Sequence, residues 1–519
     1  MNNVGYILSR VAVGVPPRIE PEHTMLVFGN QRYTYAQMNK KVNKLAYSLT
    51  KLGWKKGERV AILLRNCTEW VVSYFALAKL GLTVVPINFM MKAPEIELIM
   101  NDSACRHMIV GNDLTNLVNT IKPQLNEVSD YVVVGRNSED YVEYETLENE
   151  GEPLEPGVDV RLDDVLTIQY TSGTTGRPKG AIHTHEGTIW DFFPQIGDFK
   201  ITCDDVWLCI AALCWVAGFD HMTLATWMMG GTVVLMPSGG LMIDNLLGII
   251  QKERVTSAYI APTILNRILA FPDVKRWSVD SLVKVTSGGA PIPVSVIERF
   301  IELFPNVSFF QCYGLSEHPT IATSLSKEYA LSKIGSIGKP TTGYFIKLVD
   351  AADREVDSQV AGEICIKSLA VMKGYWNQPE ETANTLKGGW LHTGDLAQRD
   401  EDGFLYVSGR KKDMIISGGL NVYPAEIEQV ISTHPKVAEV AVIGIPDVEW
   451  GESGKAIVVL KPGELVTKEE LMQLCRDKLA NYKVPRQFEL TYESLPRTLS
   501  GKVKKFELRS REEERLKSR

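Results

Sequence analysis

A run of hydroxyl and glycine residues at positions 170–180 ends in a lysine and could bind a phosphate group. It reads Tyr-Thr-Ser-Gly-Thr-Thr-Gly-Arg-Pro-Lys-Gly and directly follows a β-branched run that predicts a strand. Glycines let backbone N–H groups approach phosphate oxygens closely, and Lys179 adds a fixed positive charge. The run is not a Walker P-loop, because Pro178 stands where that pattern has glycine. By its composition alone, the run fits an ordinary surface loop equally well.

Five further segments combine glycine with aromatic, hydroxyl-bearing or charged residues. Each segment also has a structural interpretation, as an aromatic strand residue, a helix cap, a surface carboxylate or a solvated lysine. The segments are Ser287-Gly-Gly-Ala-Pro291, Tyr313-Gly-Leu-Ser-Glu317, Trp390-Leu-His-Thr-Gly-Asp395, Gly409-Arg410 and Pro496-Arg-Thr-Leu-Ser-Gly-Lys502.

Taken together and in this order, the segments resemble the motifs of the adenylate-forming superfamily. That superfamily contains acyl-CoA synthetases, luciferases and peptide-synthetase adenylation domains, and the resemblance spans residues from about 30 to 510. It implies an ATP-dependent acid–CoA ligase that first makes an acyl-adenylate and pyrophosphate and then a thioester and AMP. ATP, Mg²⁺, CoA and a small carboxylic acid are the implied ligands.

The resemblance also assigns chemistry to single residues. Lys502 and Glu317 are implied to be catalytic, and Glu317 and Thr171 to hold Mg²⁺. Tyr313 is implied to stack on adenine, and Asp395 to bind both ribose hydroxyls. The residues implied to bind ATP are Thr171, Ser172, Gly173, Thr174, Thr175, Gly176, Lys179, Gly289, Ala290, Pro291, Gln311, Tyr313, Gly314, Ser316, Asp395, Arg410 and Lys502.

Three other positions match the family's moving parts, and one departs from its usual pattern. Lys412 matches the hinge position, and Gly418 and Gly419 match the tunnel that receives the CoA thiol arm. Ser316 stands where the family usually has threonine, which keeps the hydroxyl group.

The predicted acyl pocket is where the sequence departs most from the family. Trp215 aligns with a position that is usually histidine, and tryptophan is larger and donates but does not accept. Val216 stands where amino-acid-activating relatives have aspartate, although a shifted register would place Asp220 there instead. We therefore expect a hydrophobic acid, fatty or aromatic. The predicted pocket residues are Trp215, Phe219, Gly288 and Gly289.

The pattern of strands and helices predicts an α/β protein. In the first 400 residues, short β-branched runs alternate with amphipathic stretches, which is typical of α/β units on largely parallel sheets. Short strand-like runs at about 335–410 predict a small β-rich subdomain. We expect a large N-terminal domain at 1–411 and a smaller, mobile α+β domain with the catalytic lysine at 412–519.

Composition limits the other function classes. The 519 residues have a formal net charge of −7, which disfavours a nucleic-acid binder. The eight cysteines form no CxxC pair, so neither a zinc site nor a disulfide framework is indicated. Apolar segment 206–236 is interrupted at its centre by Asp220 and His221, which favours buried core over a membrane span. With no signal peptide predicted, we expect a cytoplasmic enzyme, and leave open a homodimer and a peripheral membrane contact.

Several alternatives stay open at this point. The acceptor could be the phosphopantetheine of a carrier protein instead of CoA, and a luciferase-like oxygenase is a further variant. Residues Gly314-Leu-Ser-Glu-His318 begin like the nucleophile elbow of an α/β-hydrolase, although histidine stands where the last glycine is expected. A non-catalytic protein on the same scaffold is the fourth alternative.

Overall fold

The computed structural model describes residues 3–12, 20–135, 140–171, 178–290, 292, 294–417, 420–447, 450–498 and 501–517. The chain divides into two compact units. Unit 1 consists of Met1–Ile334, Gly338–Phe345 and Ile366–Leu391, and unit 2 consists of Gly335–Ile337, Ile346–Cys365 and His392–Arg519.

A nine-stranded sheet in unit 1 has the order β16-β15-β14-β13-β12-β10-β11-β1-β2. The six central strands, β14, β13, β12, β10, β11 and β1, pair in parallel. Strand β2 at one edge and strands β15 and β16 at the other edge are antiparallel. The strands are β1 (Thr24–Phe28), β2 (Gln31–Thr34), β10 (Val206–Cys209), β11 (Thr232–Leu235), β12 (Ser257–Tyr259), β13 (Lys284–Gly288), β14 (Ser308–Leu315), β15 (His318–Leu325) and β16 (Lys339–Pro340).

A seven-stranded sheet in unit 1 has the order β7-β6-β5-β3-β4-β8-β9, and only its edge strand β9 is antiparallel. The strands are β3 (Arg59–Leu63), β4 (Thr83–Pro86), β5 (His107–Gly111), β6 (Asp130–Val134), β7 (Val142–Glu143), β8 (Val165–Thr171) and β9 (Lys179–Thr184).

Both sheets of unit 1 are buried on two faces, and the alternation of side chains along their strands builds the layers. In β10, Trp207 and Cys209 join one core cluster and Leu208 joins another. In β3, Val60 joins the same first cluster as Trp207, while Ala61 joins a third. Because successive strand residues point to opposite faces, the first cluster lies between the two sheets.

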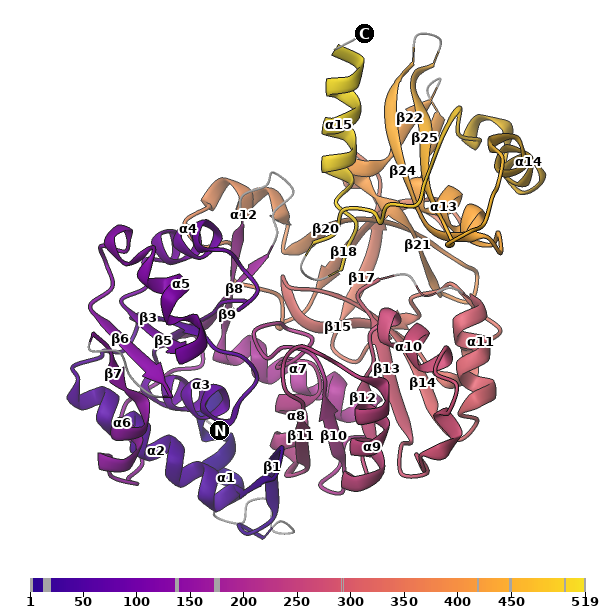
Figure 1. Cartoon of the computed structure of the whole chain (residues 1–519). Coiled ribbons are helices and arrows are strands. Elements are labelled where there is room, and N and C mark those ends of the chain that lie inside the picture. The colour runs from indigo at the N-terminus through magenta and orange to yellow at the C-terminus, as the bar shows by residue number, and fades with distance from the viewer. Residues whose placement is uncertain are drawn as a thin grey trace. The chain divides into compact units, whose positions relative to one another are not determined.

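Helices fill this middle layer and cover the outer face of each sheet (Figure 1). The middle layer contains α2 (Tyr35–Lys51), α3 (Thr68–Leu80), α7 (His185–Asp198) and α8 (Thr223–Met229). The outer helices are α9 (Ile243–Glu253), α10 (Pro262–Leu269) and α11 (Val294–Leu303) on the nine-stranded sheet, and α4 (Ala93–Ser103) and α5 (Thr115–Asn119) on the seven-stranded sheet. The other helices of unit 1 are α1 (Ile7–Ala12), α6 (Tyr144–Glu150) and α12 (Pro379–Thr385).

A five-stranded sheet is formed by strands within residues 345–410. Its order is β17-β18-β20-β19, with β21 also pairing β20. The strands are β17 (Phe345–Val349), β18 (Gly362–Lys367), β19 (Leu386–Lys387), β20 (Trp390–Arg399) and β21 (Leu405–Arg410).

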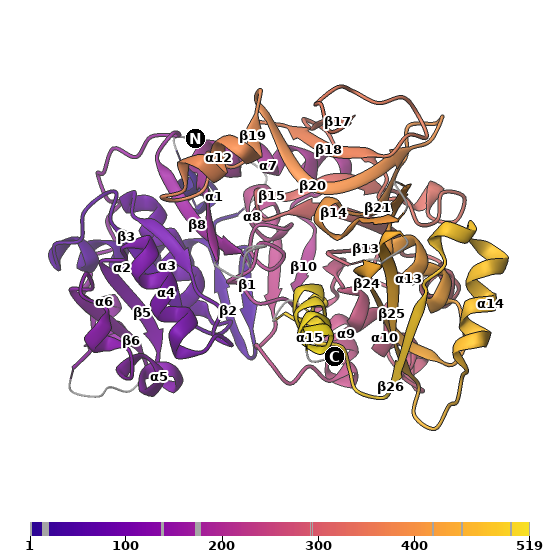
Figure 2. The same ribbon diagram turned by 90° about the horizontal axis from the view of Figure 1, so that it is seen from above.

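The C-terminal part of unit 2 is an α+β module. A mixed sheet separates helices α13 (Pro424–Ser432) and α14 (Lys468–Lys478) from α15 (Lys505–Lys517), because each face of β24 and β25 joins a different core cluster. Figure 2 shows α13 and α14 beside these strands. The strands are β22 (Ile415–Ser417), β23 (Leu420–Val422), β24 (Val437–Asp447), β25 (Gly451–Leu460) and β26 (Gln487–Thr491).

This architecture confirms the predicted fold class, an α/β protein with large N-terminal sheets and a smaller C-terminal α+β module. The apolar segment 206–236 forms β10, α8 and β11 and is buried core, as predicted. Among the described residues, no helix combines the length and apolarity needed to cross a bilayer.

Candidate active site

The predicted phosphate-binding run begins and ends on two antiparallel strands of unit 1. Strand β8 ends at Thr171 and β9 begins at Lys179, and the two residues are direct cross-strand partners. This pairing places the Thr171 hydroxyl and the Lys179 ammonium group, which are both predicted to bind ATP, at the same end of strands β8 and β9. The predicted residues Ser172, Gly173, Thr174, Thr175 and Gly176 lie outside the described residues.

Lys179 is a largely buried cation with two partners. Its ammonium group forms an ion pair with Glu381 of α12 and lies 5.3 Å from the centre of the Tyr375 ring. Only 11% of the Lys179 side chain is exposed, against 40% of the Glu381 side chain. A nearly buried ammonium group needs a counter-charge, and in this structure Glu381 supplies it.

Glu317 lies in the tight turn between β14 and β15. The Tyr375 hydroxyl donates a hydrogen bond to Glu317 Oε1 at 2.8 Å, and the Met372 amide donates to the Glu317 carbonyl at 2.8 Å. Burial raises the pKa of Tyr375 above its usual value, and the negative charge of Glu317 raises it further. The phenol therefore stays protonated and acts as a donor to the carboxylate.

Tyr375 is the residue that brings the predicted groups together, and the sequence interpretation missed it. It contacts Glu317 through its hydroxyl and Lys179 through its ring, and Lys179 is the strand partner of Thr171. Position 375 is 58 residues from its partner at 317, and no spacing rule connects them. The only local signal is the turn-forming composition of Gly374 and Asn377 on either side.

The carboxyl ends of the parallel strands β13 and β14 bring a second group of predicted residues together. Gln311 is the register partner of Ser287, and Gly288 follows directly. A Cβ atom at Gly288 would lie 2.2 Å from the Cys312 carbonyl oxygen, so only glycine fits there. Gly289 has a φ of +78°, and the Tyr259 hydroxyl donates to the Gly288 carbonyl at 2.9 Å.

Two buried polar atoms at these strand ends lack a hydrogen-bond partner among the described residues. They are the Gln311 Oε1 and Ser287 Oγ atoms. Buried polar atoms are rarely left unpaired, so such atoms at a strand end suit contact with a polar ligand. Ala290, next to Gly289, is exposed, and Pro291 lies outside the described residues.

The segment with Tyr313 and Glu317 is held against its neighbours by close packing. A Cβ atom at Gly314 would lie 1.6 Å from the Thr320 carbonyl oxygen, so glycine is required at this irregular point of the strand pair. His183 Nε2 donates to the Ser316 carbonyl at 2.8 Å. Burial lowers the pKa of His183 to about 4, so the imidazole is neutral when it holds this turn.

In unit 2, Asp395 and Arg410 form an ion pair across two strands. They are register partners on β20 and β21, and Arg410 Nε lies 2.8 Å from Asp395 Oδ1. The Asp395 amide also donates to Thr393 Oγ1 at 3.1 Å. The sequence placed both residues in one predicted nucleotide site, and the sheet register makes them direct neighbours.

Lys502, also in unit 2, lies on a tight turn and is exposed. The Thr498 amide donates to the Lys502 carbonyl at 2.7 Å, and the Lys502 amide donates to Thr498 Oγ1 at 3.1 Å. Arg497 donates to the Gly501 carbonyl at 2.6 Å and pairs with Glu439 of β24, also at 2.6 Å. The turn is therefore fixed to the C-terminal sheet.

The predicted hinge residue lies just before the first strand of the C-terminal sheet. Lys412 is the middle residue of a short helical turn, Lys411–Asp413, between β21 and β22. Gly418 and Gly419 fall between β22 and β23 and lie outside the described residues.

The chain matches two models of known protein families. A model described as AMP-binding enzyme matches residues 17–376, and one described as AMP-binding enzyme C-terminal domain matches residues 426–502. The chain belongs to the AMP-binding enzyme family. This confirms the adenylate-forming resemblance that the motifs predicted.

Similar proteins place this AMP-binding enzyme in the acyl-CoA synthetase branch. It is 37% identical to the long-chain-fatty-acid–CoA ligase FadD13 of Mycobacterium tuberculosis over 518 residues, 98% of each chain. It is 36% identical to a feruloyl-CoA synthase of Amycolatopsis sp over 494 residues, 95% of this chain and 97% of that one. The structure of the anthranilate CoA ligase AuaEII with anthranoyl-AMP matches with a TM-score of 0.87 and 30% identity, covering 98% and 96% of the two chains.

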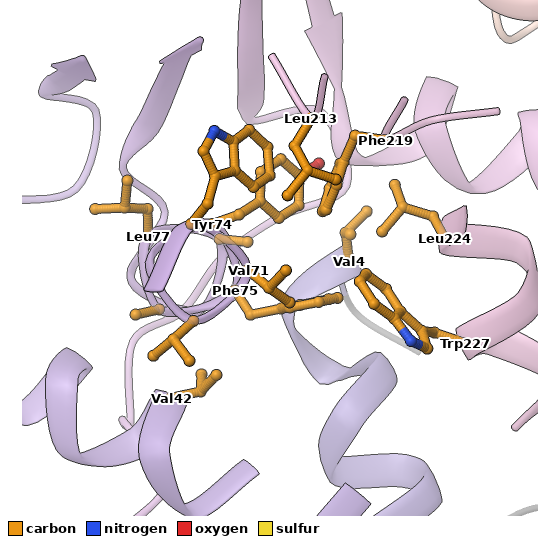
Figure 3. Close-up of a cluster of buried hydrophobic side chains, with 14 of the residues drawn as sticks. Val4, Val42, Val71, Tyr74, Phe75, Leu77, Leu213, Phe219, Leu224 and Trp227 are labelled. Atoms are coloured by element: carbon orange, nitrogen blue, oxygen red, sulfur yellow. The ribbon is translucent and has the colours of Figure 1, made fainter. Parts of the chain in front are cut away.

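Trp215 and Phe219, two of the predicted acyl-pocket residues of this AMP-binding enzyme, differ in exposure and in packing. Trp215 is partly exposed and packs against the outer core of the seven-stranded sheet. Phe219 is buried in an aromatic cluster, with its ring centre 4.3 Å from Tyr74 and 4.6 Å from Trp70 (Figure 3). The structure thus places Phe219 in the packed middle layer, and its contact with an acid stays a prediction.

The hydrolase alternative does not fit the geometry. A nucleophile elbow places its serine in a sharp turn between a strand and a helix. Ser316 instead lies in the turn between the antiparallel strands β14 and β15.

The residues present fit a Mg²⁺ ion that is shared with substrate phosphates. Among the described residues, no group of three or more His, Cys, Asp or Glu side chains could hold a metal alone. Mg²⁺ commonly binds through one or two carboxylates together with phosphate oxygens and water. Glu317 and Thr171 offer hard oxygen ligands of this kind.

Proposed function

We propose that this AMP-binding enzyme is an ATP-dependent acid–CoA ligase whose substrate is a hydrophobic carboxylic acid, fatty or aromatic. The acids in the names of its relatives support this, since ferulate and anthranilate are aromatic and long-chain fatty acids are aliphatic. The arrangement that carries the proposal is the contact chain Lys179–Tyr375–Glu317, which joins a cation and a carboxylate at the end of the predicted phosphate-binding run.

In the first half-reaction, a carboxylate oxygen of the acid forms a bond to the α-phosphorus of ATP, and the bond to pyrophosphate breaks. The carboxylate is already ionised at neutral pH, because carboxyl pKa values are about 4. No general base is needed, and the enzyme must instead bring together two anions. Lys179 and Lys502 would neutralise negative charge on the phosphates and in the transition state.

The other nucleotide contacts follow from the same proposal. Tyr313 would stack on adenine, while Asp395, oriented by Arg410, would accept hydrogen bonds from the ribose. Glu317 and Thr171 would hold Mg²⁺, and the bound ion would reduce the repulsion between the triphosphate and the incoming carboxylate.

In the second half-reaction, the thiol of CoA attacks the acyl carbonyl and AMP leaves. We propose that residues 412–519 rotate as a domain about Lys412 relative to residues 1–411, which withdraws Lys502 and brings Gly418 and Gly419 to the CoA arm. Conformational steps of this kind separate two chemistries that need different surroundings. The acid would lie near Trp215, Phe219, Gly288 and Gly289.

The Lys502→Ala variant tests the two-step proposal. Adenylation, measured as pyrophosphate release, should fall by about 10²–10³, the usual effect of removing one electrostatic contact to a transition state. Thioester formation from supplied acyl-adenylate should persist. Lys504→Ala is the matched control, because Lys504 lies two residues away and pairs with Glu507 at 2.8 Å. Equal losses in both half-reactions of Lys502→Ala would contradict the proposal.

A panel of acids tests the substrate class. Fatty and aromatic acids should release pyrophosphate with ATP, and activity confined to amino acids or to small polar acids would contradict the proposal. Free CoA should then yield a thioester. Product with a carrier protein but not with CoA would instead favour the carrier-protein alternative, and failure to form AMP with any acid would favour a non-catalytic scaffold.

We also propose a cytoplasmic location. It is supported by all eight cysteines being free, as expected in a reducing compartment. A homodimer and a peripheral membrane contact stay predictions, which light scattering and co-sedimentation with vesicles would test.

A further inference from the structure

Helix α12 and the segment before it contact both charged groups of the proposed nucleotide site. From this segment, Tyr375 donates to the Glu317 carboxylate, and Glu381 pairs with the Lys179 ammonium group. Neither residue belongs to the motifs from which the nucleotide site was predicted. Glu381 thus contacts a lysine that is proposed to bind phosphate.

The segment is fixed to the strand that carries Lys179. The Ile182 amide donates to the Gly374 carbonyl at 2.9 Å, and the Trp376 amide donates to the Gly180 carbonyl at 2.7 Å. Tyr375 is also the bridge partner of Ala181. Residues 374–376 therefore extend the β9 edge, so their position follows that of Lys179.

Helix α12 is tied to the same segment, which sets the place of Glu381. The Tyr375 amide donates to Thr382 Oγ1 at 2.9 Å, and Thr382 Oγ1 donates to the Gln378 carbonyl at 2.8 Å. Thr382 is the next residue after Glu381, so this bond anchors the turn of helix from which Glu381 reaches Lys179.

A carboxylate and a phosphate offer the same chemistry to an ammonium group. Both are anions with several oxygen acceptors, and the Lys179 side chain is only 11% exposed, so one anion at a time suits it. The Glu381 side chain is 40% exposed. It can therefore turn into water when another anion arrives, at a smaller cost than a buried carboxylate would incur.

We propose that Glu381 competes with the phosphates of ATP for Lys179 and thereby sets the affinity of the enzyme for ATP. This inference rests on the proposed function, because it takes Lys179 to be a phosphate contact. Without nucleotide, Glu381 neutralises Lys179 and holds its ammonium group in place. When ATP binds, a phosphate oxygen replaces the Glu381 carboxylate, and the broken ion pair weakens the net affinity.

The Glu381→Gln variant tests the competition. The Kd for Mg·ATP, measured by calorimetry without acid, should fall by about 3- to 5-fold, as expected from loss of a partly exposed ion pair. The control is Glu380→Gln, which removes the same charge one position earlier in α12. Glu380 is exposed and forms no ion pair with any described residue. The same change in Kd for both variants would mean a general charge effect and would overturn the inference.

The Lys179→Ala variant separates this inference from the proposed function. We expect it to weaken ATP binding, and we expect Glu381→Gln to have no additional effect beyond the control when combined with it. An unchanged Kd in Lys179→Ala would overturn both proposals. A weakened Kd in Lys179→Ala, with Glu381→Gln no different from the Glu380→Gln control, would overturn only the competition. Thermal unfolding of each variant checks that the fold is retained.

Discussion

Arg410 Nε lies 2.8 Å from Asp395 Oδ1, and the two residues face each other directly across strands β20 and β21. The Asp395 side chain is 7% exposed, whereas 38% of the Arg410 side chain is exposed. The arginine therefore orients a carboxylate that is otherwise nearly enclosed. A carboxylate fixed in this way is prepared to accept hydrogen bonds from a diol, as the proposed contact with ribose requires.

We predict that Asp395→Asn raises the KM for ATP by about 10-fold or more, because a hydrogen bond to a charged group contributes about 1.5–3 kcal/mol. The amide keeps the shape of the side chain but loses its charge and one acceptor. Initial rates of pyrophosphate release at varied ATP concentration measure the effect. Asp402→Asn, on the exposed turn between the same strands, is the control and should leave the KM unchanged. A KM for ATP in Asp395→Asn equal to that of the control would exclude a ribose contact.

Glu363 connects the Asp395 strand to the residue before the proposed hinge. Its carboxylate accepts from the Gly394 amide at 3.0 Å and from Lys411 Nζ at 3.0 Å. Burial opposes ionisation of Glu363, but the hydrogen bond and charge of Lys411 outweigh it and lower the pKa of the carboxyl. Glu363 thus positions Asp395 and holds Lys411 to β18.

We therefore predict that Glu363→Gln raises the KM for ATP about 2- to 5-fold and changes the rate of thioester formation from supplied acyl-adenylate, because it releases Lys411 next to the proposed hinge. Rapid-quench measurements of the two half-reactions separate these effects. Glu355→Gln, at an exposed position before the same strand, is the control. If thermal stability falls while both half-reactions stay unchanged, the role of Glu363 is structural only.

Tyr375 donates to the carboxylate proposed to hold Mg²⁺, so its hydroxyl should tune the metal dependence. We predict that Tyr375→Phe raises the Mg²⁺ concentration for half-maximal activity about 10-fold, as is typical when a metal ligand loses its hydrogen-bond partner. Activity at saturating Mg²⁺ should change less. Tyr47→Phe is a matched control, since Tyr47 donates to Glu152 at 2.7 Å in a different part of unit 1. An unchanged Mg²⁺ dependence in Tyr375→Phe would argue against metal binding at Glu317.

The ion pair of Lys79 with Glu155 in unit 1 should make the stability of the fold depend on pH. Lys79 has no exposed side-chain surface and donates at 2.7 Å to Ser9, Asn39, Asn43 and Glu155. Burial raises the pKa of Glu155, but hydrogen bonds from Lys79, Asn39 and Ser9 outweigh it and lower the pKa to about 2.

A lowered carboxyl pKa means that the folded state favours the ionised form of Glu155. Ionised Glu155 therefore stabilises the fold at pH values above its pKa in the unfolded chain, about 4.3. This stabilisation is lost as the pH falls toward 2. We predict that Glu155→Gln lowers the melting temperature at pH 7 and that the difference from wild type shrinks below about pH 4.5. The effect should be modest, about 1 kcal/mol or less, because 40% of the Glu155 side chain is exposed. A difference that is independent of pH would contradict this account.

The sequence by itself determined the elements, the family and the residues of each motif. Strands and nucleotide motifs are local patterns, so the strand Arg59–Leu63 was predictable from its β-branched and apolar composition. The helix Thr68–Leu80 was predicted to be amphipathic, but it is buried on nearly all sides because it lies in the layer between the two sheets. The motif residues were predictable for the same reason, because each motif occupies a few consecutive positions.

Only the tertiary structure decided which of these residues meet and what else meets them. Lys179 and Glu381 are 202 residues apart, and Glu317 and Tyr375 are 58 apart. Their contacts depend on strand order and register, which periodicity does not specify, since it reports which face of an element is buried but not which element covers it. For this reason the sequence could not predict that Phe219 packs among aromatic side chains. It also could not predict that the Glu381 carboxylate pairs with Lys179, the proposed phosphate-binding lysine.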